Sequence, residues 1–117
     1  MSARNLFVYR RTEELLYKIY PRLANFPKSE KFSLCHTIKV TFFSLLKYIS
    51  LGNSVQSKRK YYLQEADGEL QVIKVLMELS KQRKYISQGF YREISLELTE
   101  INKLLSGYIR SSTKQEK

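Results

Sequence analysis

The sequence predicts an all-α protein, built as an antiparallel up-down four-helix bundle. Three observations support this. Apolar residues recur at steps of three and four in four successive segments, which is the spacing of one helical face. Gly and Pro are scarce, at 4 and 2 of 117 residues. The segments are joined by short connections, which favour antiparallel neighbours. This length suits a single domain.

The first helix is expected from Thr12, a candidate N-cap, to about Ala24. Its apolar face comprises Leu15, Leu16, Ile19 and Leu23. Pro21 lies inside this pattern, so the helix should kink there or break before its last turn. Residues 1–11 precede it as a basic segment, residues 12–110 form the bundle, and residues 111–117 form a polar tail expected to be disordered.

The second helix should begin between Lys28 and Ser33 and end near Gly52. Its core face comprises Cys35, Ile38, Phe42, Leu45 and Ile49, and the face is broadened by Val40, Phe43, Leu46 and Tyr48. The third helix is expected from about Lys58 to Arg83, with an inner seam of Leu63, Ala66, Leu70, Ile73 and Met77.

The middle of the third helix, from Leu70 to Leu79, is apolar around most of its circumference, because its three polar residues share one narrow stripe. A helix that buries a single face needs an apolar stripe only somewhat wider than about 100°, which is narrower than the apolar part of this helix. We therefore expect this helix to be central and to contact a neighbouring subunit. The residues assigned to an oligomer interface are Phe43, Val72, Val75, Leu76 and Leu79.

The fourth helix is expected after a brief turn at 84–86, with Ser87 as its N-cap and its end near Ile109. Its apolar face comprises Phe90, Ile94, Leu98, Ile101, Leu105 and Tyr108. Glu93, Glu97 and Glu100 should lie on its outer side.

The charge is strongly positive and unevenly distributed. The formal net charge is +10, from 21 Lys and Arg against 11 Asp and Glu, and residues 31–64 contain no acidic residue. Such a run favours a polyanionic partner, although a basic surface without one is the simpler alternative. The expected phosphate contacts are Arg10, Arg11, Lys39, Lys47, Lys58, Arg59, Lys60 and Lys74.

Aromatic residues stand beside several of these cations. Tyr61, Tyr62 and Tyr85 are of the kind that stack on nucleic-acid bases, but packing at the bundle ends is the favoured interpretation.

Residues for catalysis are scarce. The only histidine, His36, follows the only cysteine, Cys35, and adjacent helical residues point about 100° apart, so they cannot form a nucleophile–base pair. Two such ligands do not make a zinc site. We expect no enzyme activity, no metal and no cofactor. One cysteine suits a reducing cytoplasm. Lys39 and Lys47 interrupt the most apolar segment, so we expect no membrane partner.

Three segments resemble the accessory variability determinant (Avd) proteins of diversity-generating retroelements. Residues 26–34, Phe-Pro-Lys-Ser-Glu-Lys-Phe-Ser-Leu, resemble the "LPK-x-E-[RK]-[FY]-x-L" segment that opens the second helix of small bacterial four-helix-bundle proteins. Residues 65–74 resemble a second segment of the Avd proteins. Residues 104–109 resemble the terminal "LG-G-W-I" segment of the Avd proteins. The resemblance covers residues 12–110. Departures from the family pattern are Cys35 for glycine, Lys74 for arginine, Glu78 for a residue that is often basic, and Tyr108 for tryptophan.

The sibling branch, encoded within ribosomal RNA intervening sequences, typically carries "S-I-P-x-N-I-A-E-G" at the end of the second helix. Residues 44–52 here contain no proline, which favours the Avd branch. The resemblance implies a non-catalytic homopentamer with a positively charged surface. It would bind a reverse transcriptase with RNA and RNA–DNA hybrid and assist mutagenic cDNA synthesis. The alternative is a structural, scaffolding homo-oligomer of the intervening-sequence branch, without a reverse transcriptase partner.

Overall fold

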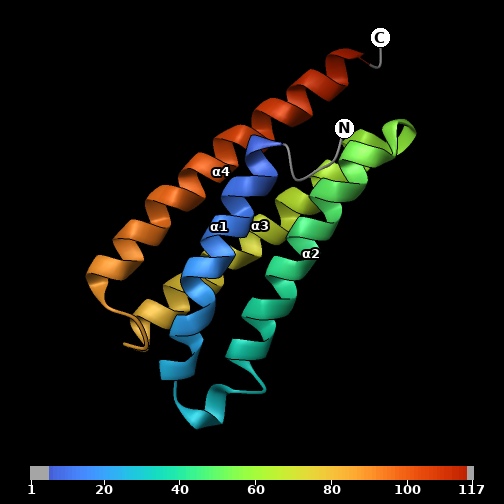
Figure 1. The fold of residues 1–117 in the computed structure, drawn as a ribbon. Helices are drawn as coiled ribbons and strands as arrows, with labels where there is room; N and C mark the ends of the chain where they lie inside the picture. The colour runs from blue at the N-terminus through green and yellow to red at the C-terminus, as the bar shows by residue number, and fades with distance from the viewer. Residues whose placement is uncertain (1–5, 116–117) are drawn as a thin grey trace.

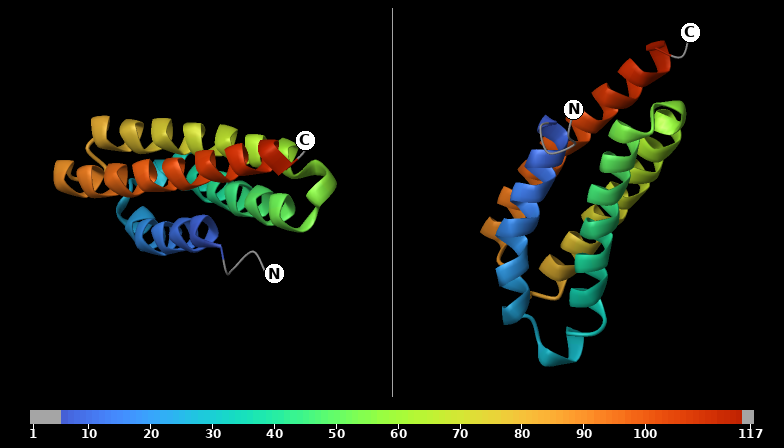
Figure 2. Two further views of the ribbon diagram at one scale, coloured as in Figure 1. Left: turned by 90° about the horizontal axis from the view of Figure 1, so that it is seen from above. Right: turned by 45° about the vertical axis from the view of Figure 1, so that its right-hand side comes forward.

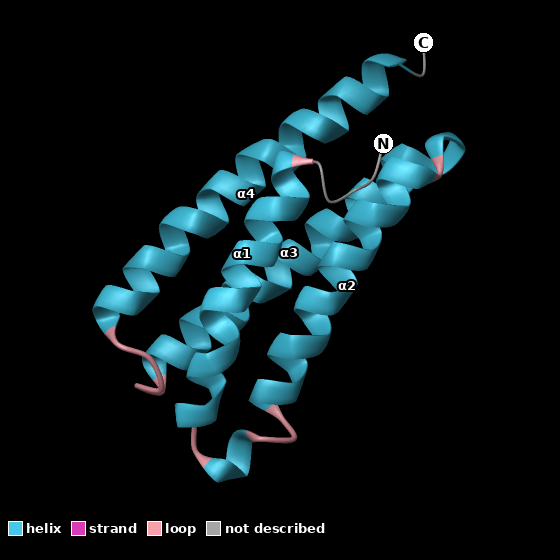
Figure 3. Ribbon diagram, viewed as in Figure 1, coloured by secondary structure: helices cyan, strands magenta, loops and turns pink. Residues whose placement is uncertain are grey.

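The computed structural model describes residues 6–115, and over these residues the chain forms four α-helices and short 3-10 segments, with no strand. The helices are α1 (Phe7–Ile19), α2 (Leu34–Ser54), α3 (Arg59–Gln82) and α4 (Gln88–Gln115). They alternate in direction along the bundle (Figures 1 and 3). The predicted four-helix bundle is therefore confirmed.

The helices pack in a ring around one core: α1 and α3 each contact both α2 and α4. The residues with no exposed surface include Leu15, Ile38, Phe42, Leu45, Ile49, Leu63, Leu70, Ile73, Ile94 and Leu105. They follow the predicted three-and-four spacing on all four helices. The two most extensive helix–helix contacts both involve α3, with α2 and with α4, whereas α1 packs less closely on its neighbours, which agrees with the predicted central position of α3.

The first helix begins earlier than predicted, at Phe7. Thr12 is fully buried and its hydroxyl donates a hydrogen bond to the carbonyl of Val8 at 2.7 Å, so it is an interior residue and not an N-cap. At the other end, α1 stops at Ile19 and a 3-10 segment, η2 (Tyr20–Asn25), starts with Pro21 in its first turn. The predicted break at Pro21 is confirmed.

The second and fourth helices run past their predicted ends. Gly52 lies inside α2, in close contact with Leu63. The fourth helix continues through the expected end at Ile109 to Gln115, and Ser112 is buried with its hydroxyl donating to Tyr108. The end of α4 projects beyond the start of α1 (Figure 2). Residues 1–5 and 116–117 of the predicted terminal segments lie outside the described residues.

The third helix ends in a left-handed residue. Lys84 has φ 62°, and the amide of Tyr85 donates to the carbonyl of Ser80 at 2.9 Å. This is the hydrogen bond of a Schellman motif, with lysine at the position that glycine usually occupies. Ser87 then caps α4, since its Oγ accepts from the amide of Phe90 at 3.0 Å. The predicted turn and N-cap are both confirmed.

The two ends of the bundle differ (Figure 1). The linker end holds η2, the 3-10 segment η3 (Lys28–Glu30) and the α3–α4 turn. The opposite end, which we call the Lys58 end, holds the start of α1, the 3-10 segment η4 (Gln56–Lys58) and the last turns of α4.

Candidate nucleic-acid interface

The predicted phosphate contacts lie in several places. Arg10 and Arg11 are exposed near the start of α1, and Lys58 is exposed in η4, at the same end of the bundle (Figure 1). Lys60, the second residue of α3, is half-buried. Lys47 is exposed midway along α2. The cations therefore form a cluster at the Lys58 end, with further positive charge along α2.

Arg59 has a structural function in this cluster. Its Nε donates to the carbonyl of Gly52 at 2.8 Å and a terminal nitrogen donates to the carbonyl of Asn53 at 2.9 Å. These carbonyls belong to the last turn of α2, where a helix has no partners of its own for them. Arg59 therefore caps α2 and fixes the geometry in which Lys58 and Lys60 are presented.

Two other predicted contacts have local partners. The Nζ of Lys74 donates to Oδ1 of Asn102 on α4 at 3.1 Å, and Lys74 lines a pocket together with Glu78. Lys39 is half-buried with its Nζ 4.7 Å from the centre of the Tyr20 ring, near the linker end. These two lysines do not lie with the cluster at the Lys58 end.

Arg11 lies beside an acidic residue. It lines a shallow pocket of about 260 Å³ with Phe7, Glu100 and Leu104. Glu100 brings a negative charge to this pocket, which lowers the local positive potential. Arg10 is not among the residues that line it.

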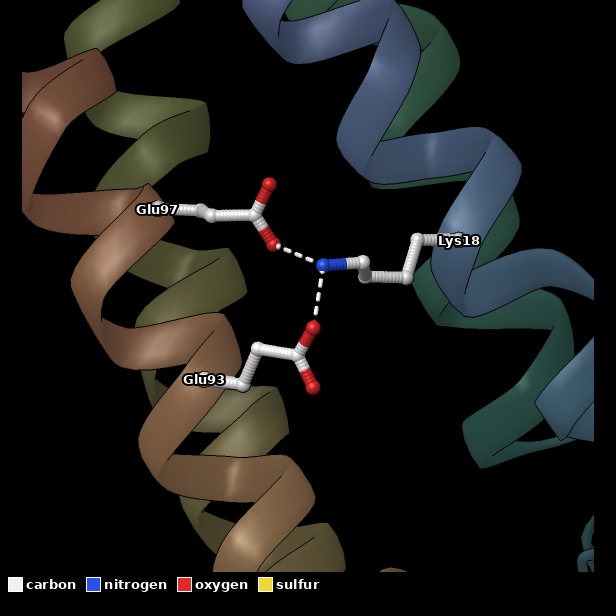
Figure 4. A network of polar contacts seen from close by, with 3 residues as sticks. All are labelled: Lys18, Glu93 and Glu97. Atoms are coloured by element: carbon white, nitrogen blue, oxygen red, sulfur yellow. Dashed lines mark hydrogen bonds and ion pairs between the residues drawn. The ribbon is translucent and has the colours of Figure 1, made fainter.

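Two acidic residues of α4 lie at the surface of the bundle, on the side that borders α1. The Nζ of Lys18 on α1 bonds to Glu93 at 2.5 Å and to Glu97 at 2.9 Å (Figure 4). The hydrogen bond that Lys18 donates to Glu93, followed by the one that it donates to Glu97, raises the pKa of Lys18. Glu93 therefore lies on the outer surface as expected, and the structure adds that it and the less exposed Glu97 pair with Lys18 across the α1–α4 boundary.

The tyrosines near the cations mostly pack within the protein. Tyr62 is stacked on Tyr48 with ring centres 6.3 Å apart, and Tyr85 lies 5.2 Å from Phe26. Tyr61 remains 57% exposed, with its ring edge against Tyr62. Packing at the bundle ends is confirmed for Tyr62 and Tyr85.

The residues assigned to an oligomer interface fall on two surfaces. Val72, Val75 and Leu79 are exposed on α3 at 45%, 64% and 41%, while Leu76 is half-buried. Phe43 lies on the α1 side of α2, where it lines a groove with Leu16, Tyr17, Tyr20 and Pro21. The apolar excess read from the sequence is therefore on the surface of the single chain.

Sequence analysis did not find a lysine-lined pocket at the linker end. Lys28 and Lys31 lie there with Lys39, around a pocket of about 370 Å³. Lys31 belongs to the acid-free run 31–64, which was a usable signal. The pocket itself was not predictable because three separate segments form its walls.

Cys35 and His36 have separate environments. Cys35 is buried and its thiol contacts the carbonyl of Leu23 at 3.7 Å, and burial raises its pKa. His36 is exposed. Among residues 6–115, no group of three or more His, Cys, Asp or Glu side chains is placed to hold a metal ion. Within the same residues, every helix falls short of the length and apolarity that a bilayer crossing requires.

The chain was compared with known proteins. Its search against curated proteins gave no match. A model of the bAvd-like family matches residues 6–112, which is almost the whole bundle and includes the three segments that carry the resemblance. The chain therefore belongs to the bAvd-like family, as an accessory protein of the Avd type.

Proposed function

We propose that this protein binds nucleic acid through phosphate contacts and acts as a non-catalytic accessory to a retroelement reverse transcriptase, aiding mutagenic cDNA synthesis. The observation that carries this proposal is the acid-free run of residues 31–64, whose cations lie at the linker end, on α2 and at the Lys58 end. Membership of the bAvd-like family supports the accessory role.

The nature of the contacts follows from the side chains. The exposed cations at Arg10, Lys47 and Lys58 suit phosphate oxygens, which carry no sequence information. Binding of this kind is driven largely by counterion release and weakens steeply with salt. The protein would then hold template and product strands, and base pairing would supply the sequence.

The assembly would be a homo-oligomeric ring, in keeping with the pentamer that the family resemblance implies. A ring requires each subunit to contact its two neighbours through two different surfaces. The exposed stripe of Val72, Val75 and Leu79 on α3 and the groove around Phe43 between α1 and α2 are two such surfaces.

The test is fluorescence anisotropy with labelled structured RNA and an RNA–DNA hybrid, titrated at several salt concentrations. For wild-type protein, the logarithm of the binding constant should fall linearly with the logarithm of the salt concentration. The double variant Lys58→Ala/Lys60→Ala should lower the magnitude of that slope by roughly 0.7 to 0.9 per lost contact. Arg59 is left intact because it caps α2.

The matched control is Arg92→Ala/Lys103→Ala, which removes the same charge from exposed positions on α4. An equal change of slope in both double variants would refute the assignment to the Lys58 end. Absence of binding by wild-type protein at low salt would refute nucleic-acid binding itself and leave the scaffolding alternative. Loss of cDNA synthesis by the reverse transcriptase on omission of the protein would support the accessory role.

A further inference from the structure

The linker end contains a pocket of about 370 Å³ between η2 and the first turns of α2. This volume is in the range of small-molecule sites in proteins. The residues that line it are Tyr20, Pro21, Leu23, Ala24, Phe26, Pro27, Lys28, Lys31, Cys35 and Lys39. One wall is thus apolar and aromatic, and three lysines complete the lining.

The walls of the pocket are held in place by contacts between the two connections at the linker end. Pro21 ends α1 and diverts the chain into η2, after which Phe26 is buried in extended conformation. Its ring lies 5.2 Å from that of Tyr85, and the hydroxyl of Tyr85 donates to Oε2 of Glu30 at 2.9 Å. The pocket is therefore formed before any ligand arrives.

The charge of the pocket is positive. None of the residues that line it is acidic. The nearest acidic residue in sequence, Glu30, does not line the pocket: its Oε1 accepts from the hydroxyl of Ser33 at 2.6 Å and its Oε2 from Tyr85. Its negative charge still acts on the Cys35 thiol and offsets part of the charge of the three lysines. Lys39 lies over the Tyr20 ring at 4.7 Å, so cation and aromatic wall are adjacent.

We infer that this pocket binds one unpaired nucleotide of an RNA strand, with the base against Tyr20 and the apolar wall and the phosphates at Lys28, Lys31 and Lys39. The inference rests on the proposed function and names the part of the nucleic acid that is bound. Bases stack on aromatic side chains whatever their identity, and lysines contact the backbone phosphates. A fully paired duplex keeps its bases stacked inside and cannot present one to the pocket.

The single cysteine offers a direct readout, because Cys35 lines this pocket and the chain has no other thiol. The measurement is the rate of Cys35 modification by a small neutral methanethiosulfonate, followed by mass spectrometry. Saturating single-stranded octauridylate should slow this rate several-fold. The same strand annealed to its complement as a blunt duplex should leave the rate unchanged.

Variants provide a second measurement that does not require Cys35 to react. Tyr20→Ala should weaken octauridylate binding about 5- to 100-fold, as expected for the loss of one stacked base. Phe32→Ala is the matched control, because Phe32 is an exposed aromatic residue that does not line this pocket. Lys28→Ala/Lys31→Ala should lower the salt dependence of octauridylate binding, which Arg92→Ala/Lys103→Ala should not.

The outcomes separate this inference from the proposed function. If wild-type protein binds structured RNA with strong salt dependence, but the Tyr20 and lysine variants bind octauridylate as wild type does, the pocket assignment is overturned alone. Equal protection of Cys35 by the duplex also overturns it. If wild-type protein binds no nucleic acid, both proposals fail.

Discussion

Gly52 provides the sharpest test of the packing between α2 and α3. It lies inside α2, and a Cβ built there would be 2.6 Å from Cδ2 and 2.9 Å from Cγ of Leu63. Leu63 has no exposed surface, so its side chain has no free space to move into. Overpacking of this kind costs about 1–3 kcal/mol. Gly68 is the matched site, because it lies in α3 with no neighbour within 4 Å of a built Cβ.

The two Gly→Ala substitutions should therefore act in opposite directions. Alanine is favoured over glycine inside a helix by about 1 kcal/mol, and at Gly68 nothing opposes this gain. At Gly52 the clash with Leu63 should exceed it, so that Gly52→Ala lowers the free energy of unfolding. Urea denaturation followed by circular dichroism, at one fixed protein concentration, gives both values.

A double-mutant cycle identifies the cause at Gly52. In a Leu63→Ala background the atoms that clash are absent, so adding Gly52→Ala should no longer destabilise the protein. Equal effects of Gly52→Ala in the two backgrounds would refute the packing argument. A gain of stability from Gly52→Ala alone would refute it as well.

Three further predictions concern other parts of the chain. Lys84→Gly should raise the free energy of unfolding by about 0.5–1 kcal/mol, because it removes a side chain from a left-handed residue, and a lower urea midpoint would contradict this. The hydrogen bond from Ser33, then that from Tyr85, lowers the pKa of Glu30 below its ordinary 4.5, so this stabilisation is present above that value and lost as the pH falls through the folded-state pKa. Glu30→Gln should thus make Tm less dependent on pH as the pH falls below the ordinary carboxyl pKa of 4.5, and unchanged dependence in a thermal melt series would exclude this role. Val75→Glu should lower the oligomer mass seen by light scattering with helicity retained, unlike Lys103→Glu, since Val75 is 64% exposed on the proposed interface, and an undiminished mass would remove α3 from that interface.

The sequence predicted the four helices and most of the core because apolar periodicity reports directly on buried faces. It misplaced helix ends where one residue type has two uses. A threonine before an apolar run caps a helix or bonds back to it, and at Thr12 the burial of Val8 one turn earlier decides for the second. A glycine ends a helix or permits close approach, and at Gly52 the position of Leu63 decides.

The charge run was visible in the sequence, but the function of each cation within it was not. Arg59 and Lys58 are adjacent and equally basic, yet one caps α2 and the other is exposed. That difference depends on the path of the chain through η4, which residue types alone do not specify. The pairing of the acidic side of α4 with Lys18 was not predictable for the same reason, since Lys18 and Glu93 are 75 residues apart in the chain.

The contacts of Tyr85 have a dynamic consequence. Tyr85 and Glu30 are 55 residues apart, and their hydrogen bond joins the α3–α4 turn to the connection between α1 and α2. Neither connection can open without breaking contacts to the other, so the two should exchange their amide protons as one cooperative unit. The end of α4 projects beyond the start of α1 and should open at lower free energy (Figure 2). A ligand at the linker end would thus meet a surface that is already ordered, and little of its binding free energy would be spent on folding that surface.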